Sequence, residues 1–77
     1  MIFETVKKVM VETLRCDADK ISPEALIGDD LKIDSLDAVE LVMSLEDEFD
    51  IKIPDNELFA MKTVGDIVAC VEKYQQE

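Results

Sequence analysis

Apolar residues recur at the spacing of an amphipathic helix in several segments of this chain. The first segment spans residues 2–14, where one face collects a set of apolar side chains: Phe3, Val6, Val9 or Met10, and Leu14. The clearest segment spans residues 35–49, and it ends before Pro54 because the residue preceding a proline avoids the helical region. We predict a short helical stretch over residues 55–59 and a last helix that ends at Tyr74.

A capping signal precedes the last helix. Thr63 and Asp66 stand three residues apart, as in a capping box, where each side chain accepts a hydrogen bond from the other residue's backbone N–H. The helix then places apolar side chains inward: Val64, Ile67, Val68 and Val71. Strand signals are weak, because only residues 51–53 alternate between apolar and polar. The pattern therefore predicts an all-α fold, a small bundle of three main helices plus one short helix.

Residues 15–34 form a connection that is long for a featureless loop, and such segments are usually functional or internally packed. Ser22 and Pro23 resemble an N-cap followed by proline at the first helical position. Gly28 would end the short helical turn that this pair predicts. We expect apolar residues of the connection to hold it against the core: Ile21, Leu26, Ile27 and Leu31.

The helix over residues 35–49 has two apolar faces when each residue is advanced by about 100°. The face that we expect to meet the core contains Ala38, Leu41, Val42, Leu45 and Phe49. A separate stripe contains Leu36, Val39 and Met43, flanked by Glu40, Glu46 and Asp47. Between Lys32 and Lys52 there are seven acidic residues and no basic one. Two interpretations stay open: a solvated acidic face, or a docking surface whose apolar anchors and acidic rim fit basic partners.

Charge and missing residue types exclude several classes of function. The 77 residues include 19 acidic and eight basic ones, and the net charge of −11 argues against nucleic acid or anionic lipid as a partner. There is no histidine, which excludes Ser-His triads and histidine metal sites, and two glycines cannot build a phosphate loop. A calcium loop starting at Asp17 would need an oxygen ligand at Ile21 and a glycine at Ser22. We therefore expect no enzyme activity and no metal site.

The two cysteines, Cys16 and Cys70, match neither a disulfide scaffold nor a zinc spacing, so we expect reduced thiols that help packing. No apolar run approaches the roughly 18 residues of a membrane span. The N-terminus lacks the basic and apolar regions of a secretory signal. We expect a cytoplasmic monomer that consists of one domain over residues 1–77.

Ser35 stands at the start of the clearest helix. Asp34 is placed as its N-cap, and Asp37 lies in the first turn, where negative charge is favoured. A phosphate on Ser35 would lie near free backbone N–H groups at the positive end of the helix dipole. The same two acids would repel it. Spacing alone favours the interpretation of Ser35 as an ordinary capping residue of a helix start.

The run Asp34-Ser35-Leu36 followed by residues 37–43 resembles the attachment motif of acyl carrier proteins. The likeness continues through residues 45–55 and 63–66 and covers nearly the whole chain. The resemblance implies that Ser35, with Asp34 and Leu36 as its motif neighbours, receives 4′-phosphopantetheine from coenzyme A through a phosphopantetheinyl transferase. It also implies that the arm holds acyl groups as thioesters and presents them to acyl-transfer and chain-elongation enzymes of fatty-acid synthesis.

The resemblance assigns two further sets of residues. By the resemblance, the first set forms a face that partners with basic docking patches recognise: Leu36, Asp37, Glu40, Met43, Glu46 and Asp47. The second set is expected to lie near a cavity that shelters the acyl chain between the helices: Val39, Leu41, Met43, Leu45, Phe59, Met61 and Ile67.

One departure from the resemblance concerns Lys32 and Ile33, where common fatty-acid carriers have Gly-Ala. We expect Lys32 to bring positive charge near the phosphodiester, and Ile33 to add apolar surface at the docking edge. Three alternatives follow: a specialised carrier for a polyketide, aminoacyl or lipid-modification pathway, an acidic interaction module without an arm, or a divalent-cation sensor.

Overall fold

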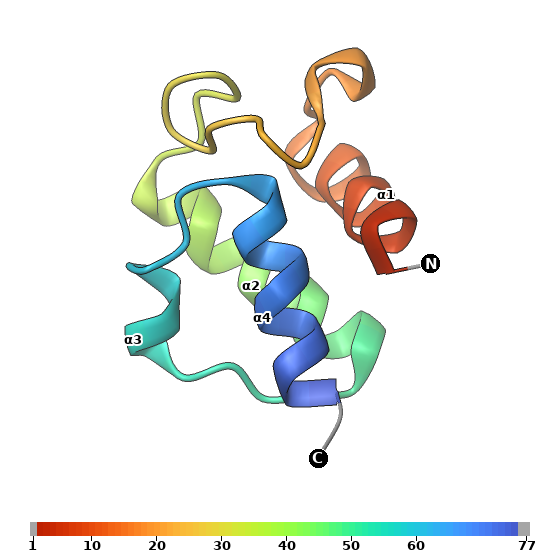
Figure 1. The fold of residues 1–77 in the computed structure, drawn as a ribbon, viewed down its shortest axis with the longest axis vertical. Coiled ribbons are helices and arrows are strands. Elements are labelled where there is room, and N and C mark those ends of the chain that lie inside the picture. Colours follow the sequence, from red (N-terminus) through yellow and green to blue (C-terminus); the bar gives the residue numbers. More distant parts are fainter. Residues whose placement is uncertain (1, 76–77) are drawn as a thin grey trace.

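Four α-helices and one 3₁₀ turn make up the computed structural model over the residues it describes, 2–75 (Figure 1). The elements are α1 (Ile2–Leu14), η1 (Ala18–Lys20), α2 (Ser35–Phe49), α3 (Asp55–Leu58) and α4 (Val64–Gln75). No strand occurs among these residues, so the predicted all-α bundle is confirmed. The bounds predicted for α1 and α2 are correct, whereas α3 ends one residue earlier and α4 one residue later than predicted. Met1, Gln76 and Glu77 lie outside the described residues.

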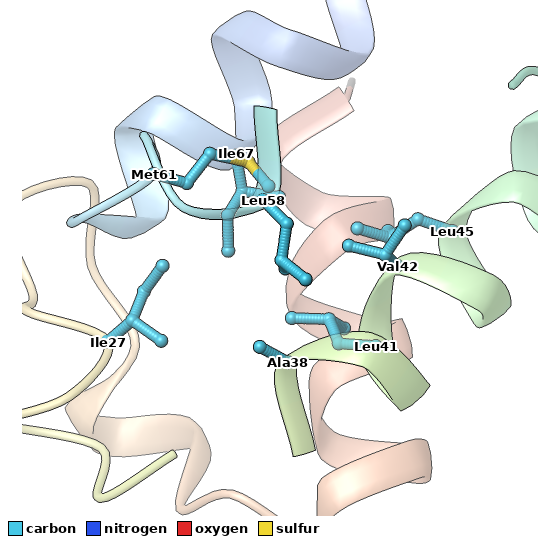
Figure 2. A pocket seen from close by; sticks show the side chains of 8 residues that line it. All are labelled: Ile27, Ala38, Leu41, Val42, Leu45, Leu58, Met61 and Ile67. Atoms are coloured by element: carbon cyan, nitrogen blue, oxygen red, sulfur yellow. The ribbon is translucent and has the colours of Figure 1, made fainter. Parts of the chain in front are cut away.

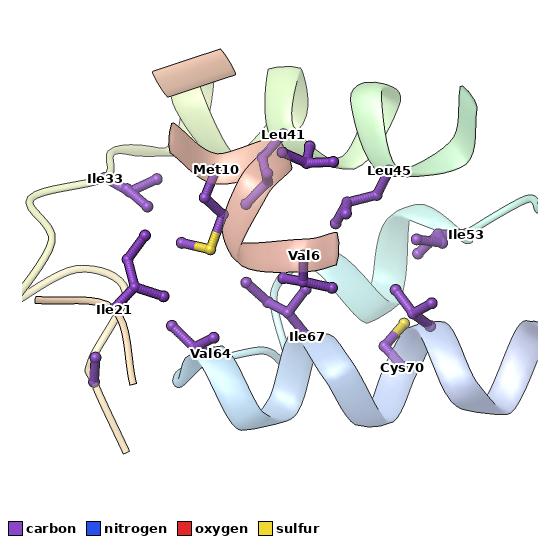
Figure 3. Close-up of a cluster of buried hydrophobic side chains, with 13 residues drawn as sticks. Val6, Met10, Ile21, Ile33, Leu41, Leu45, Ile53, Val64, Ile67 and Cys70 are labelled. Atoms are coloured by element: carbon purple, nitrogen blue, oxygen red, sulfur yellow. The ribbon is translucent and has the colours of Figure 1, made fainter. Parts of the chain in front are cut away.

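The core lies where α1, α2 and α4 face one another (Figure 3). On α1, Val9 and Met10 are both buried, which settles the alternative that the helical spacing left open. On α2, Leu41 and Leu45 are buried, and the rest of the predicted core face packs partly against them: Ala38, Val42 and Phe49. The residues that complete the core come from α1 and α4 and from the connections: Val6, Val64, Ile67, Cys70, Val71, Ile21, Ala25, Ile33 and Ile53.

The long connection adopts a different local structure from the one its sequence predicts. Residues 22–25 form a turn closed by the Ala25 N–H donating to the Ser22 carbonyl at 3.0 Å, and not the predicted short helix. The helical turn of this connection lies earlier, in η1, where the Asp17 carboxylate accepts the Asp19 N–H at 3.0 Å. The packing prediction is correct for Ile21, Ile27 and Leu31 but wrong for Leu26, which is 39% exposed.

The reason for this difference is a set of hydrogen bonds between the connection and the start of α4. The Pro23 carbonyl accepts the Gly65 N–H at 2.9 Å, and the Ala25 carbonyl accepts the Val64 N–H at 3.1 Å. The Ile27 N–H donates to the Lys62 carbonyl at 2.9 Å. A helical turn would need the Pro23 carbonyl and the Ile27 N–H for each other. These three bonds, called here the crossing ladder, therefore replace that turn.

The capping box predicted at the start of α4 is present. The Thr63 hydroxyl accepts the Asp66 N–H at 3.1 Å, and the Asp66 carboxylate accepts the N–H groups of Thr63 at 3.2 Å and Lys62 at 2.9 Å. The bonds from these two backbone N–H groups lower the pKa of the Asp66 carboxyl below its ordinary value. The capping box thus holds residues 62–66 in the conformation that receives the crossing ladder.

Replacing Gly65 by Ala should destabilise the fold by about 1 kcal/mol, because the new Cβ would lie 3.0 Å from the Pro23 carbonyl oxygen. That oxygen is held by the crossing ladder and cannot retreat without lengthening a hydrogen bond. Gly28→Ala is the matched control, because a Cβ at Gly28 has no neighbour within 4 Å. Both changes lower the conformational entropy of the unfolded chain by a similar amount. Urea denaturation of both variants measures the difference, and equal stability would contradict a steric role for Gly65.

Stability should fall in acid through Asp66. Its pKa is lowered in the folded state, so its contribution is complete above the ordinary Asp pKa of about 3.9 and is lost as pH falls through the lower folded value. Asp66→Asn should therefore have a flatter stability profile below about pH 4 than the wild type. Asp29→Asn, at another exposed position, serves as the control. Chemical denaturation across pH 2–7 measures the profiles, and parallel curves for wild type and Asp66→Asn would refute this role.

Candidate functional site

Ser35 is the first residue of α2 and points to solvent. The chain has two other serines, Ser22 and Ser44, and both are half-buried. The Ser44 hydroxyl also accepts a hydrogen bond from the Thr13 hydroxyl at 3.1 Å. Of the three serines, Ser35 is thus the most accessible to an external enzyme.

The helix start leaves free N–H groups beside Ser35. The Asp34 backbone is extended, and its carboxylate accepts the Asp37 N–H at 2.8 Å, which confirms the predicted N-cap. The first N–H groups of a helix have no carbonyl one turn earlier. With the Asp37 N–H taken by the cap, those of Ser35 and Leu36 remain for an anion. The residues present therefore fit a phosphate group esterified to the Ser35 hydroxyl.

The outer stripe of α2 is exposed, as its spacing predicts. Leu36 is 75% exposed, Met43 59% and Val39 43%, which are high values for large apolar side chains in a small protein. Glu40 and Asp47 are exposed beside them, and Asp37 is half-buried. Glu46 differs from the other acids, because its carboxylate accepts the Ile53 N–H at 2.8 Å and so anchors the segment after α2.

A small apolar cavity lies inside the bundle, next to the inner face of α2 (Figure 2). Four residues predicted to lie near such a cavity line it: Leu41, Leu45, Met61 and Ile67. Two residues of the predicted core face, Ala38 and Val42, line it as well. Its volume is about 30 Å³, close to that of one water molecule. The cavity is therefore a small gap in the packing, with walls drawn from four segments of the chain.

Three residues predicted near the cavity do not line it. Val39 and Met43 belong to the outer stripe of α2 and border a separate groove that also includes Pro54. Phe59 follows α3 and is 76% exposed. A residue on the opposite side of a helix cannot reach a space on its inner face, which explains Val39 and Met43.

The cavity prediction lacks four lining residues: Ala38 and Val42, which the sequence places on the core face, and Ile27 and Leu58. The sequence predicts that Ile27 packs on the core, which is a partial indication of its role here. Its place in the cavity wall depends on the hydrogen bond from its N–H to the Lys62 carbonyl. Leu58 lies on α3, a four-residue helix too short to show a reliable inner face from periodicity.

Ile33 is buried, at 8% exposure, and belongs to the core. The expectation that it adds apolar surface at the docking edge is therefore wrong. Lys32, just before it, is exposed and has a positive φ of 58°. This left-handed conformation is the one that glycine adopts most easily, and it turns the chain so that Ile33 enters the core before Asp34 caps α2.

The two thiols are free, with Cys16 half-buried and Cys70 buried. Burial raises the pKa of both thiols, and the nearby Asp37 carboxylate raises that of Cys16 further. Neither thiol is therefore activated as a nucleophile at neutral pH. Among the described residues there is no group of three or more potential ligands for a metal ion. Within the same residues, no helix has the length and apolar character needed to cross a membrane.

Comparison with known proteins identifies the family. A family model described as "Phosphopantetheine attachment site" matches residues 4–71. An acyl carrier protein of Helicobacter hepaticus is 54% identical over 70 residues, covering 91% of this chain and 92% of that protein. An acyl carrier protein of Clostridium acetobutylicum is 46% identical over 77 residues, the full length of both chains.

A solved structure gives the same result for the fold. It is a chain from Mycobacterium tuberculosis assigned to the acyl carrier proteins, with a TM-score of 0.87, 36% identity, and coverage of 95% of this chain and 97% of that one. A helical bundle with an exposed, capped serine thus agrees with a family match over most of the sequence. The chain belongs to the acyl carrier proteins, the family that bears acyl groups on covalently attached 4′-phosphopantetheine.

Proposed function

We propose that Ser35 is the residue that carries the 4′-phosphopantetheine, and that this single-domain, monomeric, cytoplasmic chain serves the enzymes of fatty-acid synthesis. The observation that supports Ser35 most directly is its position: an exposed hydroxyl at a helix start with two free N–H groups. Ser22 and Ser44 lack this combination, because each is half-buried. The terminal thiol of the bound arm supplies the thioester chemistry.

Ser35 acts here as a modification site, with no catalytic role of its own. Its hydroxyl must lose a proton to form the phosphodiester, and the neighbouring Asp34 carboxylate caps the helix by accepting the Asp37 N–H. The chain has no histidine that could take this proton near neutral pH. The base therefore comes from the phosphopantetheinyl transferase, and Asp34 orients the helix start instead.

The face proposed for docking combines the outer stripe of α2 with its acids. Leu36 and Met43 offer apolar area for a partner's surface, and Glu40 and Asp47 surround them with negative charge. Charge complementarity of this kind accelerates encounter and sets orientation more than it deepens affinity. A carrier that visits several enzymes in turn benefits from fast encounter and weak retention.

The cavity is proposed as the inner end of the path that an acyl chain takes. At about 30 Å³ it admits no acyl chain without movement of its walls. The shortest element of the wall is α3, which has four residues and no side-chain cap and is tied to α4 through the Glu57 carboxylate, which accepts from Lys73 and Tyr74. Leu58 on α3 and Val42 on α2 border both the cavity and the groove beside Met43, so displacement of Leu58 would open one side of the barrier between the two spaces.

Incubation of the unmodified protein with coenzyme A and a phosphopantetheinyl transferase should add one phosphopantetheine. Ser35→Ala should add none, because the acceptor hydroxyl is gone, while Ser44→Ala and Ser22→Ala should be modified like the wild type. Intact mass measures the result, and circular dichroism confirms that each variant is folded. Modification of folded Ser35→Ala would exclude Ser35 as the attachment site.

Reversing two acids of the docking face should slow arm transfer at low salt by at least about tenfold, which lies within the range of electrostatic steering. The variant is Glu40→Lys with Asp47→Lys, whereas Glu40→Ala alone should have a modest effect because one exposed charge pair contributes about 0–1 kcal/mol. Glu24→Lys with Glu72→Lys is the control, since it changes net charge equally at exposed positions off α2. The measurement is kcat/KM of the transferase at two salt concentrations, and equal losses in both double variants would reduce the effect to net charge.

A further inference from the structure

The short helix α3 and the residues just after it have little apolar packing to hold them in place. α3 is a single turn of four residues, and a helix of this length is not stable by itself. Asn56 and Ala60 are exposed, and Phe59 is 76% exposed. Leu58 and Met61 are half-buried and line the apolar cavity (Figure 2). Among the described side chains of residues 56–61, apolar packing therefore acts mainly through these two.

A cluster of polar side chains joins α3 to the last turn of α4. The Glu57 carboxylate accepts hydrogen bonds from the Lys73 ammonium at 2.9 Å and from the Tyr74 hydroxyl at 2.7 Å. The Lys73 bond, and after it the Tyr74 bond, lowers the pKa of Glu57, and the bond to Glu57 raises the pKa of Tyr74. These three residues are called here the Glu57 latch. Since Glu57 directly precedes Leu58, the latch acts on the part of α3 that lines the cavity.

The two donors of the Glu57 latch differ in how firmly they are held. The Lys73 side chain is 63% exposed, so water and salt weaken its ion pair with Glu57. Tyr74 is half-buried, and its ring packs against the core, which fixes the direction of its hydroxyl. The Lys73 ammonium also lies 5.2 Å from the centre of the Tyr74 ring, within the range of a cation–π interaction. Tyr74 is therefore the anchored member of the latch.

A pocket of about 230 Å³ lies between the α3 segment and α4, beside the Glu57 latch. Residues of both segments line it: Glu57, Ala60 and Met61 on one side, and Ala69, Cys70 and Lys73 on the other. Apolar side chains do not fill this space, so the latch bridges a gap between the two helices. Rupture of the latch would therefore free α3 from α4 here without breaking a packed interface.

The α3 segment also carries two of the side chains that close the apolar cavity. Leu58, together with Val42, separates the cavity from the groove beside Met43. Met61 lines both the cavity and the 230 Å³ pocket. The cavity has a volume of only about 30 Å³ while these side chains keep their places. A displacement of α3 moves Leu58 and Met61 together, and the Glu57 latch opposes that displacement.

We propose that the Glu57 latch controls how readily an acyl chain enters the apolar cavity, because the latch holds α3, and with it Leu58 and Met61, beside α4. The inference rests on the proposal that this cavity receives the acyl chain. Opening exchanges two hydrogen bonds at the protein surface for bonds to water, so it is reversible. Glu57, Lys73 and Tyr74 are positioning residues, since none of them lines the cavity.

The test compares wild type with Tyr74→Phe plus Lys73→Met, which removes both donors to Glu57 and keeps an aromatic ring on the core. Tyr74→Phe alone is the milder variant. Thr13→Val plus Lys8→Met is the matched control: it removes one exposed lysine and the hydroxyl that donates to Ser44 at 3.1 Å, between α1 and α2. Circular dichroism checks that each variant is folded.

Hydrogen exchange of the unmodified proteins measures the latch itself. The Glu57 and Ala60 N–H groups donate to the Pro54 and Glu57 carbonyls at 3.0 and 3.1 Å. Their exchange should be about fivefold faster in the latch variant than in the control, the factor expected for one net hydrogen bond. The Leu45 amide reports global unfolding and should change no more than in the control. Equal exchange at Glu57 and Ala60 in the two variants would overturn the latch.

Loading with an octanoyl chain from octanoyl-coenzyme A measures the effect on the acyl group. The ratio of sheltered to exposed chain follows from the methyl shifts of Leu45 and Ile67, which line the cavity, and from the rate of thioester cleavage by hydroxylamine. This ratio should rise about fivefold in the latch variant, because entry then no longer breaks the latch. Tyr74→Phe alone should give an intermediate value, and the control should match wild type.

The outcomes separate the latch from the proposed function. Faster exchange in α3 with an unchanged ratio would leave the latch a purely structural contact and overturn its control of entry, while the cavity stands. If loading shifts neither Leu45 nor Ile67 in any of the proteins, the cavity is not the destination and the inference fails with it. If folded wild type takes no arm at all, the carrier function of Ser35 fails first.

Discussion

The crossing ladder between the long connection and the start of α4 is the constraint on which the site depends. Without it, residues 15–34 would be a tethered loop whose entropy opposes any fixed path. The bonds of Pro23 and Ala25 to the first residues of α4 fix the middle of this loop. With the middle of the loop fixed, Ile27 lies in the cavity wall and Ile33 packs in the core. Asp34 then follows at the position where it caps α2.

The same arrangement explains why the two faces of α2 differ in burial. Its inner face is held by α1 and α4, which bury Leu41 and Leu45 almost completely. Its outer face has no helix over it, and the acids there repel one another across the surface. A protein of this size buries little surface, so the cost of an exposed apolar and charged face must be offset by tight packing on the opposite side of the same helix. Stability in the core thus permits an exposed, charged outer face on α2.

Local sequence determined much of this protein: the two long helices over residues 2–14 and 35–49, the cap at Asp34, the capping box at Thr63 and the separate stripe through Leu36 and Met43. Each depends on neighbours within one or two turns, so periodicity and spacing contain the necessary information.

Tertiary structure alone decided the rest. The turn at residues 22–25, the burial of Ile33 and the roles of Ile27 and Leu58 in the cavity depend on partners from remote parts of the chain. Ser22 and Pro23 favour a helical turn locally, but the hydrogen bonds offered by the start of α4 replace those that the turn would make. Local sequence patterns do not reveal such competition between hydrogen-bond partners, because the remote partner is close only in the folded chain.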